Sequence, residues 1–106
     1  MKNIEKGSGN VYADLGISDA DEMFVKAQLA AKIADVIKLQ KISQTRAAIV
    51  LGISQPKLFH MLRGHFHGIS EFEMLQCLTR LGFDVQIVIK AKSRTRKAGR
   101  LSVRFA

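Results

Sequence analysis

The chain has 106 residues, enough for one compact domain with a short extension at either end. A hydrophobic fraction of 47% is ordinary for a globular core and excludes a wholly disordered chain, and no apolar run is long enough to span a bilayer. Seventeen Lys and Arg against nine Asp and Glu give a net charge of +8, which favours a polyanionic partner.

The positive charge is unevenly distributed along the chain. Residues 1–40 carry five basic and six acidic side chains, whereas residues 41–106 carry twelve basic and three acidic ones. A basic half of this kind is typical of proteins that bind nucleic acid, although it is also found in merely soluble chains. The single cysteine, Cys77, and the lack of a secretory signal lead us to expect a cytoplasmic protein.

The first 18 residues contain three glycines and scattered polar side chains, so they are expected to form an N-terminal arm. A long helix is predicted from Asp19, as N-cap, to about Gln40, because Asp21 and Glu22 suit the first turn of a helix. Apolar residues then recur at helical spacing on one face: Phe24, Ala27, Ala30, Ala31, Ile33, Ala34 and Ile37.

Two short helices are predicted next. Ser43 can cap a helix from Gln44 to about Leu51, and Gly52 stands where the chain must turn. Ser54 can cap a following helix that has Pro56 in its first turn and ends at about Gly64. The spacing fits a helix-turn-helix, in which Ala48 is small because the next helix crosses above it, and Ile53 and Leu58 fill the space between the helices.

The last helix and the C-terminal segment follow. The run from Ser70 to Glu73 is a capping box, and its helix is expected to bury Phe72, Leu75, Leu78 and Leu81 before Gly82. The alternation in FDVQIVIK, residues 83–90, predicts a strand, whose partner is either GRLSVRF in the same chain or the same strand of a second subunit. The basic tail after it could be solvated, follow a DNA backbone, or bind an acidic partner.

The run ISQTRAAIVLGISQPKLFHMLRG, residues 42–64, resembles the helix-turn-helix of Cro, lambda repressor and the XRE-family regulators. The frame GSGNVYADLGISDADEM is similar to that of HigA-type antitoxins. The resemblance implies a mainly α, lambda-repressor-like domain of four to five helices with a C-terminal β-strand used for dimerisation. The expected division is an arm at 1–18, a DNA-binding domain at 19–82, and a strand with a basic tail at 83–106.

The resemblance also implies which residues meet DNA. Gln44 matches the position that holds a phosphate, Gln55 and Lys57 suit the edges of adenine or guanine, and Arg63 is expected at the backbone. His60 lies one turn further along the recognition helix, where it could reach a base or a phosphate. The complete expected set is Gln44, Ser54, Gln55, Pro56, Lys57, His60 and Arg63.

By this resemblance, the protein is expected to be a transcriptional repressor that binds double-stranded DNA at a palindromic operator as a homodimer. The resemblance also admits an antitoxin that represses its own operon and neutralises a RelE-like toxin. The alternative is an interaction protein that masks a toxin and binds DNA weakly. Ile49, Val50 and Phe59, which depart from the family pattern, would then form the contact surface.

Other classes of function find little support in the sequence. A zinc site could be sought among His60, His65, His67 and Cys77, but their spacing matches no common structural zinc motif. Cys77 lies among apolar neighbours on a predicted helix, so a buried thiol is the simpler interpretation. Acidic residues form no catalytic pair, and there is no phosphate-binding glycine loop. We therefore expect neither an enzyme nor a cofactor, metal or membrane partner.

Overall fold

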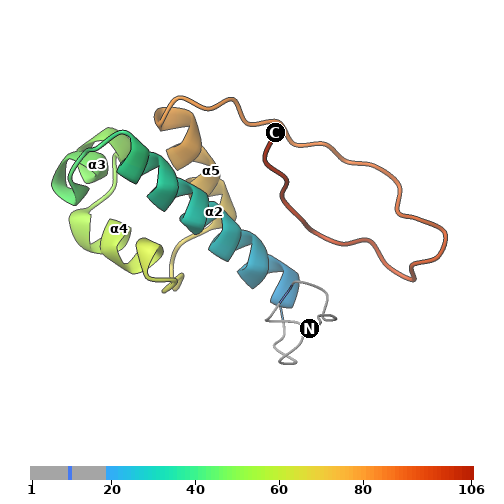
Figure 1. Cartoon of the computed structure of the whole chain (residues 1–106). Coiled ribbons are helices and arrows are strands. Elements are labelled where there is room, and N and C mark those ends of the chain that lie inside the picture. The colour runs from blue at the N-terminus through green and yellow to red at the C-terminus, as the bar shows by residue number, and fades with distance from the viewer. Residues whose placement is uncertain (1–9, 11–18) are drawn as a thin grey trace, which may run out of the picture. The chain divides into compact units, whose positions relative to one another are not determined.

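The computed structural model of the protein describes Asn10 and residues 19–106. The described part contains four helices, α2 (Ala20–Leu39), α3 (Gln44–Leu51), α4 (Gln55–Leu62) and α5 (Glu71–Arg80), so the mainly helical prediction is confirmed (Figure 1). The predicted N-terminal arm lies outside the described residues except for Asn10. None of the described helices is long and apolar enough to cross a membrane.

The helices begin and end close to the predicted positions. Ser43, Ser54 and Ser70 cap α3, α4 and α5, and the capping box between Ser70 and Glu73 is formed in both directions. Asp19 differs from the expectation. It directly precedes α2 but has a φ of 58°, in the left-handed region, whereas an N-cap residue normally has an extended backbone.

The chain divides into two compact units, of which one is Lys26–Gln86. All four helices contribute to its core. Ala47 of α3 is completely buried, α3 packs on both α4 and α5, and the amide of Gln40 donates a hydrogen bond to the carbonyl of Leu81 (3.2 Å). The largest fully buried side chains are Leu29, Ile33, Leu58, Met61, Met74 and Cys77. This shared core fixes the orientation of the short helices α3 and α4.

The apolar face of α5 agrees with the expected stripe at Leu78 and Leu81, which are buried, and differs from it in the first half of the helix. Met74, Cys77 and Leu78 are its buried residues, while Phe72 is 63% exposed. After the last turn of α5, Leu81 is buried at the helix C-cap, and the N–H of Phe83 bonds back to the carbonyl of Leu78. The expectation for Phe72 is therefore wrong.

The second unit includes residues 19–25 and 87–106 among those described. The N–H of Leu101 donates to the carboxylate of Asp21 (3.4 Å), and the N–H of Arg96 donates to the carbonyl of Ser93 in a turn. None of the described residues forms a strand, so the C-terminal strand expected at 83–90 is wrong for the single chain (Figure 1). A strand requires a neighbour to complete its hydrogen-bond ladder, and GRLSVRF does not pair with this segment.

Candidate nucleic-acid interface

The turn between α3 and α4 depends on Gly52. Its φ of 71° is left-handed, and its N–H closes the end of α3 on the carbonyls of Ala48 and Ile49. The N–H of Ile53 also bonds to the carbonyl of Ala48 (3.1 Å). Glycine enters the left-handed region without a steric cost, which allows the chain to leave α3 and start α4 within a few residues.

The side chains of α4 divide into a buried and an exposed set. Leu58 and Met61 are completely buried, which fixes the rotation of the helix about its axis. Ser54 accepts a hydrogen bond from the N–H of Lys57 (3.2 Å), and Pro56 stands in the first turn, where a missing N–H is not needed. The residues of α4 that face solvent are Gln55, Pro56, Phe59 and His60, and Arg63 is exposed at its C-cap.

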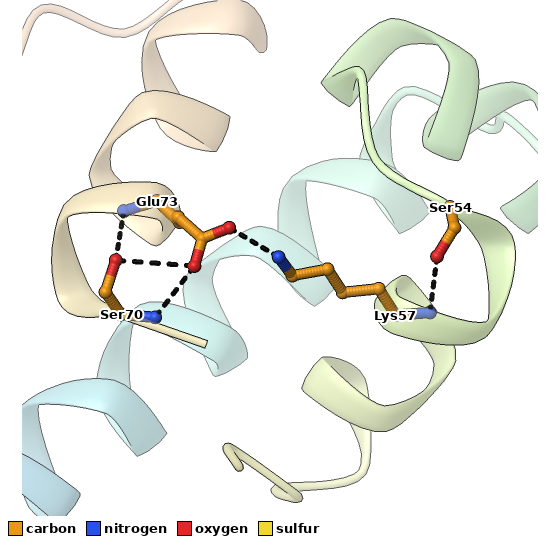
Figure 2. Close-up of polar contacts among 4 residues, drawn as sticks. All are labelled: Ser54, Lys57, Ser70 and Glu73. Atoms are coloured by element: carbon orange, nitrogen blue, oxygen red, sulfur yellow. Dashed lines mark hydrogen bonds and ion pairs between the residues drawn. The ribbon is translucent and has the colours of Figure 1, made fainter. Parts of the chain in front are cut away.

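Lys57 has a different environment from the other expected site residues. Its Nζ lies 2.5 Å from Oε2 of Glu73, so the side chain extends from α4 to the first turn of α5 (Figure 2). This ion pair is the main cause that holds the pKa of Glu73 below its ordinary value, and the backbone N–H of Ser70 adds to the effect. The ammonium expected to read a base edge therefore links two helices.

Gln44 and the exposed residues of α4 share one surface. They line a shallow hollow of about 400 Å³ in which the start of α3 meets the outer side of α4. The hollow is open to solvent and contains amide, imidazole and apolar groups together. Its lining consists of Gln44, Gln55, Pro56, Phe59 and His60. The structure thus brings four of the seven expected residues together, and adds Phe59.

Phe59 is the residue of this surface that the set of expected DNA contacts omitted. Its side chain is 45% exposed, the Arg63 guanidinium lies 5.2 Å from its ring centroid, and the His60 ring meets it edge-on at 5.8 Å. The sequence signal was present, because Phe59 departs from the small polar residue common at this position. The departure from the family pattern predicts a protein contact at this residue and does not by itself indicate contact with DNA.

A second hollow, of about 550 Å³, also has His60 in its lining. The His60 and His65 rings are 5.9 Å apart, and the N–H of His65 bonds to the carbonyl of His60 (2.9 Å). The second hollow is lined by Lys57, His60, His65, His67, Gly68 and Ile69.

Within the described residues, no group of three or more His, Cys, Asp or Glu side chains could hold a metal ion. Cys77 is buried in the core, and this burial raises the pKa of its thiol.

The helix N-termini differ in charge in a way that bears on anion binding. The first turns of α2 and α5 carry acidic residues, Asp21 and Glu22 in one and Glu71 and Glu73 in the other. The first turns of α3 and α4 carry none. Because the N-terminal end of a helix has a partial positive charge, α3 and α4 present ends that a phosphate group could approach without repulsion.

Comparison with known proteins agrees with this geometry. A model described as "Helix-turn-helix domain" matches residues 11–90. A solved structure described as "Putative XRE Family Transcriptional Regulator" is similar with a TM-score of 0.76 and 40% sequence identity, over 83% of this chain and 99% of that chain. No curated protein matches the chain. The matched residues include both helices of the candidate interface.

Proposed function

The chain belongs to the helix-turn-helix domain family, and on this premise we propose that it is a sequence-specific DNA-binding repressor. Helix α4 enters the major groove, where the amide of Gln55 reads a base edge. The start of α3, with Gln44, lies against a backbone phosphate. Lys57 supports this arrangement through Glu73 instead of reading a base.

The observation that carries the proposal is the joint surface of α3 and α4. Gln44 and the outer residues of α4 line one hollow, and neither helix has a carboxylate in its first turn. A surface that reads DNA needs donors and acceptors for base edges together with helix ends that tolerate phosphate. Both requirements are met by the same pair of helices, which supports α4 as the recognition helix.

A single α4 makes few base contacts, so we propose that the protein acts as a homodimer on a palindromic operator. Two recognition helices would read half-sites about 34–36 Å apart. The segment Ile87, Val88 and Ile89 is 72%, 78% and 92% exposed, and a second copy would cover it. Light scattering should give the mass of two chains, and Val88→Lys should shift it toward one. A wild-type mass of one chain, measured in the presence of operator DNA, would exclude the dimer.

The test of the main proposal is selection of a duplex from a random 24-base-pair library by the wild-type protein, followed by gel shifts. We expect Gln55→Ala to weaken binding of the selected duplex by roughly 10- to 100-fold, because the variant cannot hydrogen-bond to a base edge. Gln76→Ala, at an exposed position of α5, is the matched control and should bind as the wild type does. If no duplex is enriched, the proposed function is wrong.

A second candidate function is the masking of a protein partner, such as the toxin of an antitoxin pair. The observation in its favour is the exposure of apolar side chains, since Ile49 is 66% and Phe59 is 45% exposed. Coexpression with the product of the adjacent gene separates the candidates. A stable complex that Ile49→Glu disrupts, together with no enriched duplex, favours masking. A stable complex together with salt-sensitive DNA binding favours an antitoxin that also represses its operon.

A further inference from the structure

Phe59 and Pro56 form a small apolar patch within an otherwise polar recognition surface. They are three residues apart on α4, which places them on the same side of the helix. Both are exposed and both line the hollow that Gln44 and Gln55 also line. The exposed phenyl ring thus lies beside the residues proposed to read bases, where it can contact an apolar group of a bound duplex.

The position of the phenyl ring is held from two directions. The Arg63 guanidinium lies over one face at 5.2 Å, and the His60 ring approaches at 5.8 Å with an interplanar angle of 72°. Contacts of both kinds favour this orientation of the ring. Phe59 differs in this respect from Phe72 of α5, which is 63% exposed and makes no ring or cation contact of this kind among those described.

The major groove offers one group that matches such a surface. Base edges there present nitrogen and oxygen donors and acceptors, with the C5-methyl group of thymine as the apolar exception. A methylated cytosine carries its methyl group at the same C5 position. We propose that Pro56 and Phe59 form a subsite for a pyrimidine C5-methyl group, and that Phe59 is a specificity-determining residue. This inference rests on the proposed function and adds to it the group that is recognised.

The experiment uses the full-length protein and the duplex selected from the random library by the wild-type protein. Each thymine of that duplex is replaced in turn by uracil, which removes the methyl group and keeps the hydrogen-bonding groups. At one thymine in each half-site, we expect the wild-type affinity to fall by about three- to ten-fold, as the removal of one buried methyl group predicts. In Phe59→Ala the same replacement should have no effect, and in Phe59→Leu it should have a reduced effect.

Matched controls separate recognition from stability. Phe72→Ala removes another exposed phenyl group, from α5, and should show the full uracil effect. Thermal unfolding of Phe59→Ala should follow the wild-type curve closely, since Phe59 is outside the core. A parallel series methylates each cytosine of the selected duplex at C5. A loss of affinity with uracil assigns the subsite to thymine, whereas a gain with methylation that Phe59→Ala abolishes assigns it to 5-methylcytosine.

The inference is overturned if neither series changes the affinity, or if the uracil effect is equally large in Phe59→Ala and in the wild-type protein. Those outcomes leave the proposed function intact, because the selected duplex is still bound and Gln55→Ala still weakens it. The absence of any enriched duplex overturns the proposed function instead. The two failures are therefore distinguishable in the same experiment.

Discussion

Lys57 is an expected DNA-contact residue whose side chain also links two helices. Its ammonium pairs with Glu73, whose other oxygen accepts the backbone N–H of Ser70 at the start of α5 (Figure 2). The same carboxylate thus completes a capping box and holds a lysine of the recognition helix. Ser54 in turn caps α4 on the N–H of Lys57. The first turns of α4 and α5 are consequently linked by this ion pair and by the hydrogen bonds of Ser54 and Ser70.

The ion pair between Lys57 and Glu73 predicts a pH dependence of stability. The pKa of Glu73 is lowered in the folded protein relative to its ordinary value of 4.5, so the unfolded chain takes up this proton at a higher pH. The stabilisation is therefore present above pH 4.5 and is lost as the pH falls through the folded pKa. Urea unfolding should show Lys57→Met less stable than wild type by about 0.2–1 kcal/mol at about pH 6, as for partly exposed ion pairs.

Below the folded pKa of Glu73 the two proteins should be nearly equal in free energy of unfolding, because the carboxylate is then protonated in the wild type as well. Glu73→Gln, which cannot ionise, should resemble Lys57→Met in showing a weaker pH dependence. A difference between wild type and Lys57→Met that stayed constant as the pH was lowered from about 6 until Glu73 was protonated would show that Lys57 acts through packing of its stem alone.

At the scale of the elements, the turn between α3 and α4 has a strict backbone requirement. Gly52→Ala places a Cβ at a φ of 71°, a region that costs an L-residue about 1–2 kcal/mol. The new Cβ would also meet the Arg80 guanidinium at 2.7 Å, although the end of this flexible side chain can move. We expect the free energy of unfolding, measured with urea, to fall by about 1–2 kcal/mol.

Two further variants test the cause of that loss. Gly99 has open space around its Cα and is not in the left-handed region, so Gly99→Ala should leave stability unchanged. Gly52→Asn should be less destabilising than Gly52→Ala, because asparagine tolerates the left-handed conformation better. Equal losses of stability for Gly52→Ala and Gly52→Asn would point to the contact with Arg80, and not to the backbone, as the source of the cost.

The same elements show which features a sequence can specify. The caps at Ser43, Ser54 and Ser70 and the turn at Gly52 were predicted correctly, because each depends on interactions within a few residues. The buried face of α5 was predicted correctly at Leu78 and Leu81 but not at Phe72, since it depends on how the helix packs against partners far away in the chain. The strand at 83–90 does not form in the single chain for a related reason, because alternation does not supply a neighbour; its pairing with a second subunit stays a prediction.

In the candidate site, too, local features could be predicted from the sequence and contacts between distant residues could not. Gln44 and the outward residues of α4 line one hollow, and the resemblance to helix-turn-helix regulators groups four of these residues as expected DNA contacts. The pairing of Lys57 could not be inferred from its place in the recognition helix, because Glu73 is 16 residues away and reaches it only through the fold. Whether the expected residues contact DNA stays a prediction.

At the scale of the whole molecule, positive charge is concentrated in two parts of the sequence. The unit Lys26–Gln86 carries eight basic and four acidic side chains, and residues 87–106 carry seven basic and no acidic ones. Cations that neutralise phosphates release condensed counterions from the DNA. Each neutralised phosphate therefore makes the slope of log affinity against log salt concentration more negative by about 0.9. We expect the unit Lys26–Gln86 and residues 87–106 to contribute to DNA binding in different ways.

We expect the C-terminal cations to supply affinity without sequence preference. The variant to test replaces Arg94, Lys97, Arg100 and Arg104 with Gln, and retains Arg96 because one of its guanidinium nitrogens is buried. Binding to the selected duplex and to a scrambled duplex of equal length should weaken by the same factor, and both salt slopes should fall by about 0.9 for each phosphate that the variant leaves without a cation.

Gln55→Ala should instead weaken only binding to the selected duplex and leave the salt slope unchanged, because an amide neutralises no phosphate. Fluorescence anisotropy titrations between about 50 and 200 mM salt would measure both quantities. A tail variant with an unchanged salt slope would mean that these cations do not approach the DNA backbone, and the basic tail would then be available to an acidic protein surface.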